Sequence, residues 1–187
     1  GTLSVRAAAI VERIIELARH PGPLRRLGAA AAVTACYRVL REDMSLLTIY
    51  ALPLCHALLS ALRQADADDL GLGSMAALQL ALDKFDRILR RPELFTHKRG
   101  AAAGSAVTPQ TLGAPPETAD FASFAGLLWR WSVLPETAAR TTSQRLLSLM
   151  SDMSRWLTDR PDALGELERA SQLFDGVAWP TDTDLSL

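Results

Sequence analysis

Apolar residues recur every three or four positions along most of this chain, which is the spacing that places them on one face of an α-helix. The clearest stripe lies in residues 74–91 and consists of Leu78, Leu82, Phe85 and Leu89. The apolar positions are filled mainly by Leu and Ala, which are good helix formers, whereas strand-favouring residues are scarce. The pattern therefore predicts an all-α protein.

Proline and glycine divide this pattern into separate helices. Residues 20–23, with two prolines and a glycine, end the first helix, and Pro23 suits the first position of the second. Pro53 lies inside the third helix, where we expect it to cause a kink. Ser74 is a suitable N-cap for the fourth helix. About seven helices are predicted, at residues 3–19, 23–41, 45–64, 74–91, 119–134, 137–157 and 161–175.

The helices are spaced as pairs, with a period of about 40–47 residues that is typical of HEAT and armadillo repeats. One pair cannot bury its apolar face alone, so we expect a segment of a helical-repeat solenoid. A helical bundle that closes on itself is the alternative arrangement. The predicted parts are two HEAT-like pairs at 1–95, a flexible linker at 96–118, a further pair plus one helix at 119–175, and a tail at 176–187.

Charge and cysteine content narrow the classes of function. The 20 basic and 21 acidic residues give a net charge of −1, which argues against an autonomous nucleic-acid module. Cys36 and Cys55 have neither metal-ligand spacing nor a disulfide framework, so we expect a reducing compartment, cytosol or nucleus. Residues 3–18 are amphipathic rather than a signal peptide, and charged residues interrupt each apolar run, so no membrane span is predicted.

Basic residues form two local clusters on the predicted helices and in the linker. Such clusters bind phosphate groups or acidic partners in some proteins, and form ordinary solvated faces in most. Arginine near the end of a helix also interacts favourably with the helix dipole. The positions proposed as phosphate or partner contacts are Arg25, Arg26, Arg90, Arg91, Lys98 and Arg99.

Other reactive residue types do not form a recognised catalytic or metal-binding pattern. Cys55 and His56 are adjacent on a predicted helix, so their side chains point in different directions and do not suit a nucleophile–base pair. Asp66, Asp68 and Asp69 lack the glycine and distal glutamate of a calcium loop and are expected to form a solvated turn. No catalytic, cofactor-binding or metal-binding residue is therefore predicted in this chain.

Two further local hypotheses concern the predicted helices. Asp83 and Arg87 lie four positions apart, which predicts an exposed ion pair within one helix. Trp129 and Trp131 could stack on bases, but residues two apart on a helix face different ways, so at least one is expected in the core.

A longer stretch carries a family likeness. From residue 20 to residue 88, and more weakly beyond the linker, the chain resembles the helical scaffold of the DNA-dependent protein kinase catalytic subunit family over about 130 residues. The matching positions include His20-Pro21, Arg26-Leu27-Gly28-Ala29, Tyr37-Arg38, Arg41-Glu42, Ser45-Leu46, Leu72-Gly73, Arg87-Ile88 and Arg130-Trp131.

This resemblance implies a non-catalytic HEAT-like segment of a much larger chain. The family acts in the nucleus in double-strand break repair by non-homologous end joining, with the Ku heterodimer and DNA ends. Its serine/threonine kinase, with ATP and magnesium, lies near the far C-terminal end, and no kinase signature occurs in this sequence. Partners of the segment itself would be the adjacent repeats of the same chain. Where the family pattern in the linker is more basic, this chain retains only His97-Lys98-Arg99.

The resemblance also draws attention to Ser143-Gln144 and Ser171-Gln172, because Ser-Gln is the target class of this kinase family. Both serines lie on predicted helices, where a chance occurrence is the plainer interpretation. The competing function is a generic HEAT-type interaction adaptor unrelated to DNA repair. A helical enzyme using His56 or the aspartates has no supporting constellation.

Overall fold

The computed structural model describes residues 2–68, 73–91, 94, 115–118 and 120–158. Within these residues every regular element is helical, which confirms the predicted all-α class. The elements are α1 (Thr2–Arg19), α2 (Pro23–Glu42), α3 (Met44–Asp68), α4 (Ser74–Leu89), the 3-10 helix η2 (Pro116–Thr118), α6 (Phe121–Trp131) and α7 (Thr137–Thr158).

The helix boundaries agree with the predicted ones to within a few residues. The predicted helix at 161–175, the tail and most of the linker lie outside the described residues. The end of the predicted linker forms η2, in which the Thr118 hydroxyl donates a 2.9 Å hydrogen bond to the Pro115 carbonyl. Thr118 is fully buried, so this part of the linker belongs to the fold.

Short local signals set the starts of the helices. Pro23 occupies the first turn of α2, and the carboxylate of Asp43 accepts hydrogen bonds from the backbone amides of Ser45 and Leu46 at the start of α3. The cap of α4 differs from the prediction. Gly73 is the N-cap residue, in the left-handed conformation with φ 71°, and Ser74 is the buried first residue of the helix.

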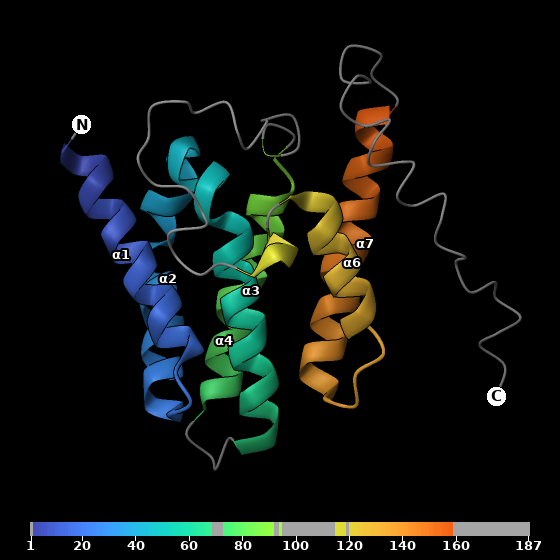
Figure 1. Ribbon diagram of the computed structural model, residues 1–187, viewed down its shortest axis with the longest axis horizontal. Coiled ribbons are helices and arrows are strands. Elements are labelled where there is room, and N and C mark those ends of the chain that lie inside the picture. Colours follow the sequence, from blue (N-terminus) through green and yellow to red (C-terminus); the bar gives the residue numbers. More distant parts are fainter. Residues whose placement is uncertain (1, 69–72, 92–93, 95–114, 119, 159–187) are drawn as a thin grey trace, which may run out of the picture.

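The first four helices stack as two pairs (Figure 1). α1 packs on α2 within one pair and on α3 of the next, and α2 in turn packs on α4. Like helices of successive pairs therefore lie side by side, which is the contact that repeat stacking requires. α7 departs from this rule, because it packs against both α3 and α4, and α6 packs mainly on α7 and η2. Continuation of the stack into a solenoid stays a prediction.

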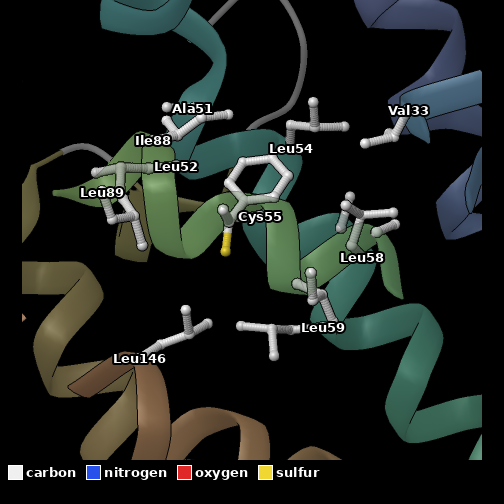
Figure 2. Packing of buried hydrophobic residues seen from close by; sticks show 14 of the residues in the cluster. Val33, Ala51, Leu52, Leu54, Cys55, Leu58, Leu59, Ile88, Leu89 and Leu146 are labelled. Atoms are coloured by element: carbon white, nitrogen blue, oxygen red, sulfur yellow. The ribbon is translucent and has the colours of Figure 1, made fainter. Parts of the chain in front are cut away.

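The core is centred on α3. Figure 2 shows Leu58 and Cys55 of α3 among apolar side chains contributed by three other helices, including Val33 of α2, Ile88 of α4 and Leu146 of α7. None of these five residues is more than 2% exposed. One contiguous core thus joins both helix pairs to α7.

The expectation that no apolar run reaches membrane-spanning length was wrong for α3. This 25-residue helix is long and apolar enough to cross a membrane by length and composition alone. Within the fold, however, 72% of its most apolar window is buried, as expected for a helix at the centre of a packed core. Pro53 is also buried there, and the helix continues through it.

Candidate functional site

The adjacent arginines Arg25 and Arg26, predicted together as phosphate or partner contacts, have opposite environments. Arg25 is exposed on α2, whereas the Arg26 side chain is fully buried. Sequence reasoning placed both on a solvated surface, and for Arg26 that was wrong. Successive residues are about 100° apart around a helix, so one can face water while its neighbour faces the core.

The Arg26 guanidinium ties the turn before α2 to the C-terminal end of α3. It donates hydrogen bonds to the Pro21 carbonyl and, at 3.2 Å, to the Gln64 side-chain oxygen, and it forms an ion pair with Asp68. Asp68 remains 45% exposed, so its carboxylate keeps contact with water while the arginine does not. A buried cation needs such partners, because an unpaired charge in a core is strongly unfavourable.

Basic side chains converge at the C-terminal ends of α2 and α4. The Arg41 guanidinium carbon lies 5.8 Å from the centre of the Tyr37 ring, and the Lys84 ammonium lies 5.4 Å from the same centre. Arg90 is exposed nearby in sequence, at the end of α4. Arg91 is half-buried and its guanidinium lies 3.2 Å from the Met44 sulfur.

The basic cluster that the structure forms around Tyr37 contains residues other than the predicted ones. Arg41 and Lys84 were not among the predicted contacts, yet they come from two helices to one aromatic ring. The i, i+4 spacing of Tyr37 and Arg41 was a signal that sequence reasoning could have used, whereas Lys84 is brought there only by packing of α2 on α4. Lys98 and Arg99 lie outside the described residues.

A second set of charges joins α7 and the residue before it, Glu136, to α3 and α4. The Arg145 guanidinium of α7 pairs with Asp83 and lies 3.5 Å from Asp86, both on α4. Arg63 of α3 lies 2.9 Å from Glu136, before α7. The predicted ion pair between Asp83 and Arg87 within α4 is therefore wrong. Asp83 pairs instead with Arg145 of α7.

The environment of these carboxylates shifts their pKa values in opposite directions. Burial raises the pKa of Asp86, and the nearby Arg145 guanidinium only partly offsets that increase. The hydrogen bond from Arg63 lowers the pKa of Glu136. This joint thus contains one carboxylate, Asp86, whose charged form is disfavoured by burial and one, Glu136, whose charged form is stabilised by Arg63.

The aromatic residues near this joint have structural surroundings. Trp129 and Trp131 are both half-buried and pack against the core, which agrees with the expectation for at least one of them. The Trp131 ring lies 5.9 Å from the His56 ring and 5.8 Å from the Arg63 guanidinium carbon. Those contacts occupy part of the ring surface that stacking on a base would require.

The other candidate reactive side chains, Cys55, Asp66 and Asp68, are buried or already bonded to other residues of the fold. Cys55 is fully buried, and burial raises the pKa of its thiol far above the ordinary value, so the thiolate nucleophile is not formed. Asp66 accepts a 3.3 Å hydrogen bond from the Ala138 amide, and Asp68 pairs with Arg26. Over the part of the chain that the structure describes, no group of three or more candidate metal ligands comes together.

Ser143, a predicted phosphorylation residue, is fully buried in α7, and its hydroxyl makes no hydrogen bond to the described residues. A kinase could reach that hydroxyl only after α7 separates from its neighbours. Ser171 lies outside the described residues. The surfaces open to a partner are thus the basic end of α2 and α4, around Tyr37, and the outer faces of the helices.

Comparison with known proteins decides the family. The family model for the DNA-dependent protein kinase catalytic subunit, CC1/2, matches residues 4–104, which is more than half of the 187-residue chain. The chain belongs to this family. The matched range contains α1 from its third residue, all of α2 to α4, and ends before α6. The resemblance inferred from the sequence is therefore confirmed within residues 4–104, which contain its most specific part at residues 20–88, while its weaker continuation beyond the linker stays a prediction.

Individual relatives support the same assignment over short stretches. The DNA-dependent protein kinase catalytic subunit of Dictyostelium discoideum is 40% identical over 58 residues, which is 31% of this chain and 1% of that protein. The protein of that name from Xenopus laevis is 31% identical over 87 residues, and the one from Mus musculus is 30% identical over 94. These two alignments cover 46% and 50% of this chain.

The chain thus spans only 1–2% of the length of the curated relatives it matches. No solved structure matches it at a significant level. The activity and partners of the much longer proteins are therefore matters for proposal.

Proposed function

We propose that this chain is a non-catalytic helical scaffold segment of a DNA-dependent protein kinase catalytic subunit homologue. The observation that carries the proposal is the overlap between the family match and one continuous core. Residues 4–104 contain all but the first two residues of the four stacked helices, and their buried surface joins one pair to the next. Such a segment transmits position and strain along an array rather than forming a cleft for chemistry.

The parent protein would be a serine/threonine kinase that acts in the nucleus in double-strand break repair by non-homologous end joining. ATP and magnesium would bind its kinase domain, at a distance in sequence from this segment. The Ku heterodimer and DNA ends would be partners of the parent. The HEAT-type repeats on either side would be the immediate neighbours of α1 to α4.

Two measurements test this proposal. The purified 187-residue chain, supplied with ATP, magnesium and a Ser-Gln peptide, is expected to transfer no phosphate above a blank, because its sequence contains no glycine-rich nucleotide loop and no kinase catalytic-loop signature. Robust transfer would overturn the scaffold assignment.

The second measurement separates a repair protein from a generic adaptor. The full-length parent is expected to co-purify with Ku on DNA ends and to phosphorylate a Ser-Gln peptide when DNA ends are added. A parent that binds other proteins through its helices, yet shows no response to DNA ends, would favour the adaptor function instead.

A further inference from the structure

One face of α2 combines exposure with an apolar surface. Leu24, Gly28, Ala31, Ala35 and Val39 follow one another at intervals of three or four residues, so they form a stripe along the helix, here called the α2 stripe. All five are exposed, and the large side chains at the two ends, Leu24 and Val39, are 68% and 60% exposed.

The α2 stripe lies opposite the face through which α2 joins the fold. The side chains that α2 buries include Arg26, Ala29, Ala30 and Val33, about half a helical turn away from the stripe. Contacts with α1, α3 and α4 use that buried side. Nothing within the described residues covers the opposite side.

α7 shows how a water-facing helix surface of the same fold is built. Its exposed positions include Thr141, Gln144, Arg145, Ser148 and Asp152, all of which are polar. Single exposed apolar residues are common on proteins, but an aligned set without a polar interruption is unusual for a surface that stays in water. The contrast indicates that the α2 stripe is a packing face.

Gly28 supplies an independent observation. A helix with glycine at an interior position is less stable than the same helix with alanine there, because glycine gives the unfolded chain more conformational freedom to lose on folding. Among the described glycines, Gly73 alone has a positive φ, so the backbone at Gly28 does not require glycine. A Cβ atom built at Gly28 would meet no other atom within 4 Å, so no neighbour in this fold requires it either.

Gly126 in α6 is equally open, so an exposed helical glycine alone would carry no conclusion. The two positions differ in their surroundings. Each glycine has an exposed arginine within one turn, Arg130 for Gly126 and Arg25 for Gly28, but only Gly28 of the two also lies between exposed apolar residues, Leu24 and Ala31. At the centre of such a surface, small side chains allow another helix axis to approach closely.

We propose that a helix from the remainder of the longer polypeptide packs along the α2 stripe, with its large apolar side chains seated over Gly28, Ala31 and Ala35. The proposal rests on the proposed function, which makes this chain a segment of a parent many times its length. The matched part of this chain covers only 1–2% of the length of each relative, so a parent of similar length has many other helices that can pack on this face.

Charge at the edges of the stripe specifies the covering helix further. Arg25 is exposed on one side, and Arg38, whose side chain is 86% exposed, lies on the other. Glu42 approaches Arg38 only to 3.8 Å. The covering helix therefore has an apolar stripe with aspartate or glutamate along both edges, since those carboxylates would meet the two guanidinium groups.

Thiol labelling in the full-length parent tests the proposal. In the Ala31→Cys protein we expect a maleimide to modify position 31 at least tenfold more slowly than position 76 in an Ala76→Cys control, with both sites followed by peptide mass mapping. Ala76 is also an exposed alanine, on α4. Equal labelling rates at the two sites in the folded parent would overturn the proposal.

The identity of the occupant is tested in the 187-residue chain. There position 31 is expected to label as fast as position 76, because the covering helix is missing. Protection that persists in this shorter chain and disappears on dilution would show that a second copy covers the face, and would overturn the proposed occupant.

A variant with a larger side chain at position 28 gives a second test of the proposal. Adding Gly28→Leu to the Ala31→Cys parent is expected to increase labelling at position 31 about tenfold by forcing the covering helix away, whereas Gly126→Leu leaves it unchanged. In the 187-residue chain, Gly28→Ala is expected to raise Tm by about 2–4 °C, since the helix gains stability and loses no contact. These readouts are independent of phosphate transfer and of Ku, so they can fail while the proposed function stands.

Discussion

The region formed by α1 to α4 and the region formed by α6 and α7 share one apolar core, but partly exposed ion pairs also connect the second region to the first. In the first region, α3 supplies a nearly continuous set of buried apolar side chains to its neighbours. The second region adds buried residues of α6 and α7 to that core, among them Phe124, Leu128 and Leu146, and the Arg63–Glu136 and Arg145–Asp83 pairs connect it to the first region. Hydrophobic burial is not directional, whereas an ion pair fixes position and depends on salt.

The family match follows the same division, because residues 4–104 include the first region and stop before the second. The stacked pairs are thus the part of the described fold that the family match covers, and α7 packs against that part through α3 and α4. Substitutions that act on one region and spare the other will test this division.

The largest expected effect comes from removing core volume at the centre of the first region. Leu58→Ala is expected to lower the free energy of unfolding by about 3 kcal/mol, since Leu58 is fully buried between helices and a cavity would remain. Leu128→Ala, at an equally buried position of α6, should act mainly on α6 and α7. Denaturant unfolding with hydrogen exchange measures both effects. Equal loss of protection across α1 to α4 in the two variants would contradict the division.

Breaking the buried Arg26 network should have the next largest effect. Arg26→Met is expected to cost about 2 kcal/mol, because Asp68 and Gln64 lose their partner while the methionine still fills space. The matched control is Arg25→Met, at the exposed neighbouring position, which should change stability by less than about 0.5 kcal/mol. Thermal unfolding of the two variants gives the comparison, and similar losses would show that Arg26 is not anchoring the turn.

The helix caps give a smaller and pH-dependent contrast. Asp43→Ala at the start of α3 is expected to cost about 1 kcal/mol near neutral pH. Asp120→Ala, which removes a 2.7 Å bond to the Ser123 amide, should affect α6 by a similar amount and leave α3 protected from hydrogen exchange.

The pH dependence of the Asp43 effect has a definite sign. The Ser45 side chain and the backbone amides of Leu46 and Ser45 lower the pKa of Asp43 in the folded chain. Its stabilising contribution is thus fully present above the unfolded value of about 3.9 and is lost as the pH falls through the lower folded pKa. The stability difference between wild type and Asp43→Ala should therefore narrow below about pH 4. A difference that widened on acidification would contradict the capping role.

The smallest effect is expected at the ionic joint between the regions. Arg145→Gln should lower stability by about 0.5 kcal/mol at low salt, because the Arg145 side chain is 41% exposed and its pairs are screened. Arg38→Gln, in a pair within α2 whose arginine is 86% exposed, is the control and should have almost no effect. Unfolding in low and high salt measures the difference. Salt-independent loss in Arg145→Gln would show that packing, rather than charge, holds α7 there.

The order of helices was predictable from local features. The 3.6-residue period of the apolar positions, together with Pro23 and the prolines and glycines between helices, determined where α1 to α4, α6 and α7 lie. The run from Arg26 to Ile88 also carried enough identity to indicate the family, which the match over residues 4–104 confirms. These are properties of short or continuous stretches, so they can be read without knowing the contacts.

The environments of individual charges were not predictable in that way. Arg26 is paired with a residue 42 positions away, and Asp83 with one 62 positions away. Lys84 reaches the Tyr37 ring only because α2 packs on α4. An arginine or lysine is stable on a solvated helix face, and it is also stable inside a core when hydrogen-bond or ion-pair partners surround it. The residue type alone therefore does not predict whether the side chain is exposed or buried.

The sequence by itself thus determined the helical class and the approximate helix boundaries of the described residues, and the family of the chain. Only the tertiary structure decided that Arg26 and Ser143 are buried, that Asp83 faces α7, and that the face around Gly28 is left uncovered by the described residues. The physical reason is that helix formation depends on neighbours within one or two turns, whereas burial and charge pairing depend on which helices meet.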